Sequence, residues 1–287
     1  PRVEQRGAGL KRGTSALGGA LAATVAAWTG SGFAAERAFD VSFDGRAYFE
    51  SAYLSSGGSL SYTEPVAEQY GVLTAQLWDY GRLHFDAWFC SALNGQHDDS
   101  HRRAYYICED TLMYGYDLAL AKDVTLSTTG GVLWDFLWGY KEPQDFPVFW
   151  YGYQYLRNPY VTPYWNGLGE IDTVTRARVR FGVNHAFSLP KSIVLTPFVE
   201  GTWGDPDRFE SNYGAQPEND RLLGGAMMFA TFGFSVEWRF AEHFYAWGRY
   251  RQYILVDSQA RDLVASKDTP TAETDFPIFG LGLGCRF

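Results

Sequence analysis

The sequence FGLGLGCRF, residues 279–287, alternates apolar side chains with glycine and ends on an aromatic residue. Phe279 and Phe287 lie an even number of residues apart, so a β-strand would place both rings on one face. Soluble domains more often end in polar, poorly ordered residues. The segment therefore predicts a terminal strand, and its partner has to come from the rest of the chain.

The composition of the 287 residues favours strands and argues against several classes of protein. Aromatic residues make up 17%, yet the mean hydropathy is only −0.23. A helical membrane protein needs runs of about 20 apolar residues, none of which follows residue 35, and a disordered chain would lack the aromatics. The net charge of −9 argues against nucleic acid as a partner. Alternation of apolar and polar residues, the strand period, explains both values.

Residues 1–35 have the anatomy of a cleaved secretory signal peptide. Lys11 and Arg12 precede an apolar stretch at 16–28, and small residues surround Ala34 and Ala35. This order is typical of export signals, and the apolar part is short for a membrane span. We expect cleavage near Ala34 or Ala35 and a mature domain of residues 36–287. The alternative is an uncleaved N-terminal helix that anchors the protein.

The mature chain alternates strand-like segments with two kinds of connection. Period-two segments occur at 41–53, 82–89, 124–140, 175–187 and 227–240. Short connections at 79–82, 121–123, 189–192 and 241–243 alternate with long polar ones centred near residues 62, 99, 155, 213 and 266. This pattern predicts ten antiparallel strands, with both chain ends on the side of the short turns. Outer-membrane barrels have this asymmetry, and a sheet in lipid must close because no backbone group can stay unpaired.

Taken together, these features resemble the bacterial outer-membrane β-barrel superfamily, whose last strand characteristically ends on an aromatic residue. Phe279 and Phe287 would then belong to the terminal assembly signal. The resemblance covers the chain from about residue 37 and implies an all-β, transmembrane, up-and-down antiparallel barrel of ten strands. It also implies the outer membrane of a diderm bacterium, insertion by the outer-membrane assembly machinery, and contact with outer-membrane lipids and lipopolysaccharide. The long loops would be extracellular and both termini periplasmic.

The alternative to a membrane barrel is a secreted β-sandwich or a soluble lipocalin-like barrel. Such a protein would place its apolar residues inside and would have no reason to turn arginines inward. Nor would it need Trp134, Trp138 and Trp203 near strand ends on the apolar face, where they are typical of an aromatic girdle.

If the apolar face contacts lipid, the other face lines a lumen that carries both signs of charge. The predicted lumen residues are Arg46, Glu50, Asp86, Asp135, Arg176, Arg178, Arg180, Glu200, Glu237, Arg239, Arg249 and Arg251. A barrel of about ten strands is narrow, and an unpaired desolvated charge costs several kcal/mol. Balanced charges therefore favour an ion-paired plug, whereas Arg176, Arg178 and Arg180 could instead form an anion path.

Residues 141–170 form an unusually aromatic connection. Long connections are usually functional or contain further structure. Three interpretations compete with simple packing against the barrel rim: an extra hairpin around Asn158–Pro159, which would make twelve strands; a segment folded into the lumen; and an aromatic surface for an external ligand. The ligand-binding candidates would be Trp150, Tyr151, Tyr153, Tyr155, Tyr164 and Trp165.

Cys90 and Cys108 lie equally far from residue 99, at the centre of one long loop. In an oxidising compartment this placement predicts a disulfide. Strand alternation conflicts with the prediction, since it points Cys90 inward and Cys108 outward, so the bridge would need a β-bulge. Residues 97–101, HDDSH, are interpreted as a solvated tip, because one flexible loop rarely supplies the ligands of a metal site.

The sequence contains no recognisable catalytic constellation. Omptin proteases, which are outer-membrane barrels, use two aspartates opposite an Asp–His pair. Asp98 and Asp99 match the first pair, but residues 204–220 contain no histidine. His84 has no evident serine partner. We therefore expect a non-enzymatic barrel without cofactor or metal, either a narrow solute or anion channel or a plugged barrel. The alternatives are a surface-binding, adhesion or envelope-structural protein that acts through residues 141–170, and a hydrolase at the barrel rim.

Overall fold

The computed structural model describes residues 40–54, 60–62, 65–77, 80–93, 106–138, 148–171, 177–204, 226–258, 261 and 274–287. All of them belong to one compact unit, residues 39–287. The expected signal peptide, the HDDSH segment with Asp98 and Asp99, and Arg176 lie outside the described residues, as do the side chains of Cys108, Asp135 and Trp138. Within the described ranges, no helix is long and apolar enough to span a membrane.

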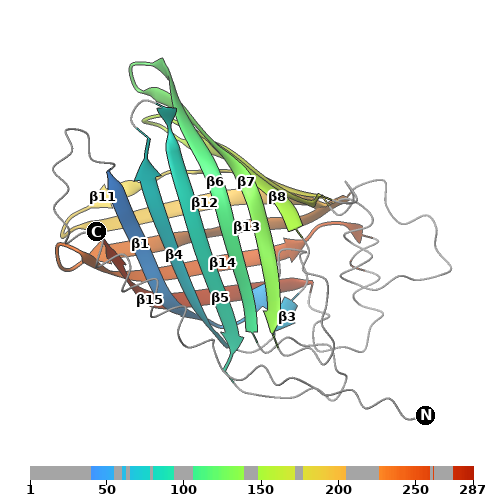
Figure 1. Cartoon of the computed structure of the whole chain (residues 1–287). Helices are drawn as coiled ribbons and strands as arrows, with labels where there is room; N and C mark the ends of the chain where they lie inside the picture. The colour runs from blue at the N-terminus through green and yellow to red at the C-terminus, as the bar shows by residue number, and fades with distance from the viewer. Residues whose placement is uncertain are drawn as a thin grey trace, which may run out of the picture. The chain divides into compact units, whose positions relative to one another are not determined.

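The strands form an antiparallel sheet that closes into a barrel (Figure 1). They are β1 (Val41–Glu50), β4 (Val66–Gln76), β5 (Arg82–Ala92), β6 (Tyr106–Ala121), β7 (Val124–Trp138), β8 (Val148–Arg157), β9 (Thr162–Glu170), β10 (Arg178–Asn184), β11 (Phe187–Leu189), β12 (Ile193–Gly204), β13 (Ala226–Arg239), β14 (Phe244–Leu255) and β15 (Asp275–Arg286). β10 and β11 pair with successive parts of β12 as one interrupted strand, so twelve strands surround the lumen. β2 (Tyr53–Leu54) and β3 (Leu60–Tyr62) form a separate small ladder.

The strand number is twelve because residues 148–170 form the hairpin β8–β9. Asn158 makes its turn: the side-chain Oδ1 accepts hydrogen bonds from the backbone N–H groups of Tyr160 at 3.0 Å and Val161 at 3.1 Å, the local bonding that favours asparagine in turns. Of the interpretations of the aromatic connection, the extra hairpin is therefore correct. The picture of one external loop over 141–170 is wrong, because most of that segment is barrel wall.

The first and last strands close the barrel, and we call their contact the seam. β1 pairs with β15 in antiparallel register, with Tyr48 opposite Gly282 and Glu50 opposite Gly280. Reciprocal backbone hydrogen bonds join Phe43 and Phe287 at 2.9 and 3.0 Å. The segment that ends on Phe287 thus has both edges paired, with β1 and with β14.

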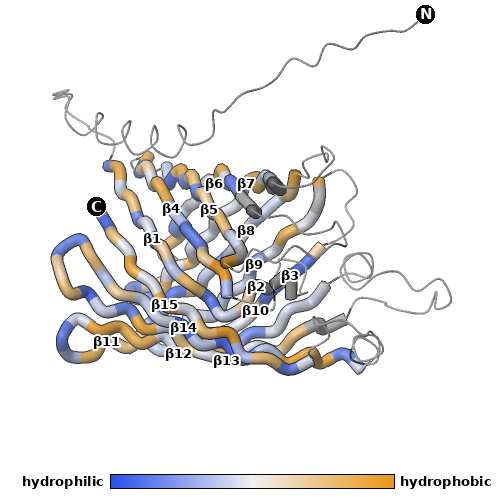
Figure 2. Tube along the Cα trace, turned by 90° about the horizontal axis from the view of Figure 1, so that it is seen from below, coloured by the Kyte–Doolittle hydropathy of each residue, from blue (hydrophilic) through white to orange (hydrophobic). Residues whose placement is uncertain are grey.

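The barrel is apolar outside and polar inside, the reverse of a soluble barrel. Large outward side chains are strongly exposed, among them Phe49 at 59% and Leu281 at 71%, whereas charged inward side chains such as Glu50 and Arg178 are buried. Figure 2 shows the resulting alternation of hydrophilic and hydrophobic positions along the strands. A soluble lipocalin-like barrel would have the opposite arrangement, so that alternative does not fit the structure.

Connections and outward tryptophans follow the pattern of a membrane-spanning barrel. Short turns join β4 to β5, β6 to β7, β8 to β9, β11 to β12 and β13 to β14, and they alternate with longer connections at the opposite end. Trp134, Trp150 and Trp203 lie on outward positions of their strands towards the long-connection end, and Trp165 and Trp238 lie towards the short turns. Bands of aromatic residues at both ends are typical of outer-membrane barrels.

Candidate functional site in the barrel lumen

One inward cluster is centred on Glu50, whose side chain is only 1% exposed. Arg249 donates to Glu50 Oε1 from Nε at 3.0 Å and also from Nη2, and Arg251 Nη2 donates to Glu50 Oε2 at 2.7 Å. Glu50 and Arg249 both lie opposite Gly280, on the two sides of β15. A Cβ atom at Gly280 would come within 2.9 Å of Glu50 Oε1. The glycine therefore lets β1 and β14 form an ion pair across the strand between them.

Glu68 on β4 is a second buried carboxylate close to this cluster. It accepts hydrogen bonds from the Tyr48 hydroxyl at 2.6 Å and from Trp88 Nε1 at 2.8 Å. Tyr48 also packs against Trp247 of β14, with ring centroids 5.0 Å apart, above the bare backbone of Gly282. Aromatic and carboxylate groups of four strands thus interlock on this side of the lumen.

Ion pairs continue towards the short-turn end of the barrel. Asp44 accepts hydrogen bonds from Arg286 Nη2 and from the Tyr245 hydroxyl, both at 2.6 Å. Glu237 pairs with Arg239 at 2.8 Å and with Arg286 at 3.4 Å. Two further basic side chains are placed by their neighbours: Arg46 lies over the Trp247 ring, 5.0 Å from its centroid, and Arg82 pairs with Asp117 at 2.7 Å.

Four tyrosines form a continuous column on the wall made by β8 and β9. Adjacent ring centroids lie 6.0 Å apart for Tyr151 and Tyr153, 5.4 Å for Tyr153 and Tyr155, and 5.7 Å for Tyr155 and Tyr164. We call Tyr151, Tyr153, Tyr155 and Tyr164 the tyrosine column. All four residues are half-buried. Tyr151 packs against the buried side chains of Leu133, Phe149 and Leu168 at one end of the column.

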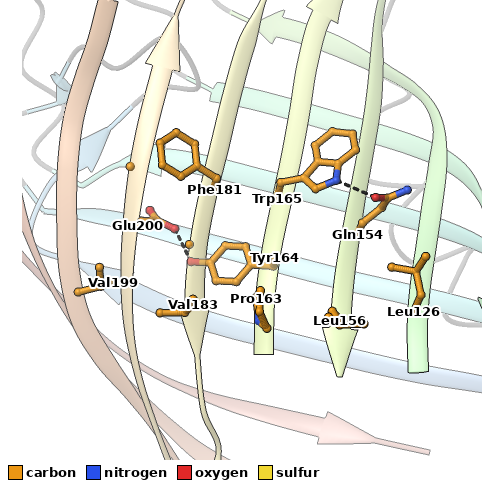
Figure 3. A pocket seen from close by; sticks show the side chains of 12 residues that line it. Leu126, Gln154, Leu156, Pro163, Tyr164, Trp165, Phe181, Val183, Val199 and Glu200 are labelled. Carbon is orange, nitrogen blue, oxygen red and sulfur yellow. Dashed lines mark hydrogen bonds between the residues drawn. The ribbon is translucent and has the colours of Figure 1, made fainter. Parts of the chain in front are cut away.

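Glu200 ties the tyrosine column to the arginines of β10. The Tyr164 hydroxyl donates to Glu200 Oε2 at 2.7 Å (Figure 3), and Arg180 Nε lies 3.4 Å from Glu200 Oε1. Gly182 lies between Tyr164 and Glu200 in the register, and a Cβ there would come within 2.9 Å of both side chains. β10 thus repeats the arrangement of β15: a glycine lets side chains of the two flanking strands meet.

The structure places the predicted lumen residues with described side chains on the inward face: Arg46, Glu50, Asp86, Arg178, Arg180, Glu200, Glu237, Arg239, Arg249 and Arg251. Of the predicted ligand-loop residues, Tyr151, Tyr153, Tyr155 and Tyr164 face the lumen, whereas Trp150 and Trp165 face outward. Sequence reasoning missed Glu68, Tyr70, Tyr245 and Arg286 as interior groups. The alternation of inward and outward residues along their strands was the signal that could have found all four.

The predicted disulfide between Cys90 and Cys108 does not form. Cys90 is a free, fully buried thiol. In the ladder of β5 and β6, Cys90 lies opposite Ile107 and Phe89 lies opposite Cys108, with no register shift. Residues opposite each other share a face, and adjacent residues take opposite faces, so positions 90 and 108 belong to opposite faces of this ladder. The bulge that the bridge required is absent from this ladder.

Reducing agent is therefore expected to leave the stability of the barrel unchanged. A bridge that closed this loop would contribute roughly 3 kcal/mol in the chain-entropy model, and its reduction would lower the midpoint of urea unfolding accordingly. Unfolding curves of the refolded protein with and without dithiothreitol measure this directly. A clear drop with reductant would mean that Cys90 is bridged after all.

The outward wall beside the tyrosine column carries an apolar groove of about 530 Å³ (Figure 3). Its lining includes Leu156, Trp165, Phe181 and Val199, which all face away from the lumen. Gln154 also faces away from the lumen, and its Oε1 accepts a hydrogen bond from Trp165 Nε1 at 2.8 Å. The pairing satisfies both polar groups on a face that the rest of the barrel makes apolar.

A closed antiparallel barrel with an apolar exterior, aromatic bands at both ends and a charged interior is the fold of a bacterial outer-membrane β-barrel. No family model and no curated protein matches the sequence. Among solved structures, the chain is similar to an outer-membrane channel from Pseudomonas putida F1, at 13% identity and TM-score 0.47 over 90% of this chain and 99% of that one. It is similar to the translocator domain of the autotransporter NalP from Neisseria meningitidis, at 9% identity and TM-score 0.41 over 95% and 96%. It is also similar to the outer-membrane protease OmpT from Escherichia coli, at 10% identity and TM-score 0.30 over 88% and 99%.

Proposed function

We propose that the protein is a narrow outer-membrane channel for small solutes whose lumen charges are held in fixed pairs. The observation that carries the proposal is that inward arginines are paired with carboxylates. Arg249 and Arg251 both pair with Glu50, and Arg180 lies beside Glu200. These three side chains remain 15–24% exposed, so the interior keeps contact with solvent while its net field is small.

The orientation and surroundings follow from the same proposal. The long connections face the cell exterior, and the short turns and both chain ends face the periplasm of a diderm bacterium. Outer-membrane lipids and lipopolysaccharide cover the apolar face, and the terminal strand with Phe279 and Phe287 is the segment that the assembly machinery binds. Residues 148–170 are wall, so they give no support to an adhesion function through an external aromatic loop.

A transport function fits the described lumen better than catalysis does. Among the described residues, the inward histidine is His84, whose Nδ1 lies 2.9 Å from the Thr74 hydroxyl. Within the described part of the chain, Nε2 on the other side of the His84 ring is buried without a hydrogen-bond partner. The nearby carboxylate of Asp117 pairs with Arg82 and does not orient the histidine. A nucleophile, a base and an orienting group in one line are what hydrolytic catalysis requires.

Single-channel recording in a planar bilayer tests the proposal. The refolded protein is expected to give small conductance steps, with a reversal potential near zero in a salt gradient, because paired charges select weakly between ions. Asp86 accepts a hydrogen bond from Tyr70 at 2.9 Å, and Asp86→Asn keeps an acceptor oxygen while it removes charge. The variant is expected to shift the reversal potential towards anion selectivity.

Asp123→Asn is the matched control, since Asp123 lies in the exposed turn between β6 and β7. It removes the same charge away from the lumen and is expected to leave selectivity unchanged. A folded barrel that never conducts would contradict the channel. Strong anion selectivity of the unmodified protein would contradict the pairing of its arginines.

A further inference from the structure

The tyrosine column has the geometry of a binding surface for flat rings. Its neighbouring rings are inclined by 60° for Tyr151 and Tyr153 and by 69° for Tyr153 and Tyr155. Tilted and edge-to-face contacts at these separations are the favourable arrangement for aromatic pairs, because the positive edge of one ring meets the negative face of the next. A planar aromatic solute can add to such a series without any rearrangement of the wall.

Hydrogen bonds fix two of the four side chains of the column. Tyr164 donates to Glu200, and the Tyr153 side chain is hydrogen-bonded to Thr129. Tyr155 lies between them, with its ring centroid 5.4 Å from that of Tyr153 and 5.7 Å from that of Tyr164. A ring that contacts Tyr155 therefore meets neighbours that are already held in place.

Positive charge lies along the same wall. Arg178 and Arg180 are within electrostatic range of Tyr151, and Arg157 and Arg180 are within range of Tyr155. Arg157 is exposed where β8 meets its short turn. Two carboxylates also lie at the column: Glu200, which accepts from Tyr164 and lies beside Arg180, and Asp86, which is within electrostatic range of Tyr153. Arg157 is the exposed cation at the short-turn end of the column, and its charge favours an anionic solute there.

We infer that the tyrosine column, with Arg157 at its short-turn end, binds small aromatic carboxylates. The ring of the solute adds to the tilted series of tyrosines, and the carboxylate is attracted by the Arg157 guanidinium group. A neutral sugar would leave this cation unused, and a saturated acid would lack the ring contacts. This inference rests on the proposed channel only for its access route, because binding can be measured without transport.

Saturation-transfer-difference NMR on the refolded full-length barrel in detergent measures this binding with three probes of similar size. The probes are benzoate, cyclohexanecarboxylate and benzyl alcohol, which separate the ring from the charge. Since an aromatic pair contributes about 0.5–1.5 kcal/mol beyond its buried area, benzoate is expected to bind roughly two- to tenfold more tightly than the saturated acid. Equal binding of benzoate and cyclohexanecarboxylate would overturn the role of the rings, and tighter binding of benzyl alcohol than of benzoate would overturn the role of charge.

Paired variants locate the site within the lumen. Tyr155→Leu is expected to weaken benzoate binding by roughly two- to tenfold, whereas Tyr116→Leu, which removes an outward tyrosine of β6, is expected to have no effect. Arg157→Gln is expected to weaken benzoate but not benzyl alcohol, and Lys122→Gln in the exposed β6–β7 turn removes the same charge as a control. Tyr155→Phe keeps the ring and isolates the hydroxyl, which keeps the test valid if the leucine variant fails to fold. Equal losses in a test variant and its control would overturn the site.

Conductance and binding can fail separately. Benzoate binding at the column in a barrel that never conducts would leave this inference standing and contradict the channel. Conductance without any difference among the three probes would leave the channel standing and overturn the aromatic carboxylate.

Discussion

Gly282→Val is expected to prevent closure of the barrel. Gly282 lies inward on β15, opposite Tyr48 of β1 and Trp247 of β14. A Cβ atom at this position would overlap the Ala47 carbonyl oxygen and the Tyr48 side chain. Because one of these clashes is with backbone, rotation of a side chain cannot relieve it. Overpacking of this kind costs up to about 3 kcal/mol and occasionally more, and at the seam the whole cost falls on the pairing of β1 with β15.

The fraction of protein that refolds into lipid vesicles with native β-sheet circular dichroism measures the effect. Leu281→Val is the control, since Leu281 is outward and 71% exposed on the same strand, and it is expected to refold normally. Intrinsic β-propensity predicts the opposite ranking, because valine favours strands more than glycine does. Normal refolding of Gly282→Val would mean that β1 and β15 do not approach as closely as the register indicates.

Glu50→Gln is expected to destabilise the barrel by about 3–5 kcal/mol, the range measured when one partner of a buried ion pair is removed. Glu50 is the shared acceptor of Arg249 and Arg251, so its neutralisation leaves two guanidinium groups without their carboxylate. Glutamine keeps the size and one acceptor oxygen, which limits the change to charge. Urea unfolding of the vesicle-inserted barrel, followed by circular dichroism, gives the free-energy difference.

The comparison variant is Asp275→Asn, which removes the partner of Arg261 in an ion pair with both side chains more than two-fifths exposed. Exposed pairs contribute about 0–1 kcal/mol, so the expected difference between the two variants is several kcal/mol. Equal stability of the two would indicate that solvent reaches Glu50 and that the lumen is wide. The same result would weaken the proposal of a narrow channel.

Alternation predicted the faces of the barrel correctly because a strand leaves no freedom in which side a residue takes. Arg178, Arg180 and Glu200 were placed inward from parity alone, and Phe279 and Phe287 were placed on one face of the last strand. The strand number was harder to predict: ten strands were expected, with twelve as the alternative if residues 141–170 held a hairpin, and twelve are present. In the β8–β9 hairpin the inward residues are themselves tyrosines, so both faces are aromatic and the polar half of the alternation disappears.

The contacts between side chains could not be predicted from the sequence. They depend on register, because a shift of two residues would keep every face and change every partner. The pairing of Glu50 with Arg249 needs β1 and β14 to be level at Gly280, and no local pattern encodes this. For the cysteines, the sequence already held the correct answer. Strand alternation put Cys90 and Cys108 on opposite faces, which argues against a disulfide. The prediction of a bridge rested on their equal distance from residue 99, and this was the weaker argument.

The ion pair across Gly280 is a local reporter of assembly. Glu50 and Arg249 belong to strands that share no backbone hydrogen bonds with each other, and they meet because β15 lies between them. In a chain whose first and last strands have not yet joined, the two residues have no reason to interact. A double-mutant cycle on Glu50 and Arg249 therefore gives a coupling energy that is near zero in every open intermediate and is acquired when the ring of strands is complete. If this coupling energy is measured along a refolding time course, its appearance gives the time at which the barrel closes. Circular dichroism gives the time at which secondary structure forms, so the two steps can be separated.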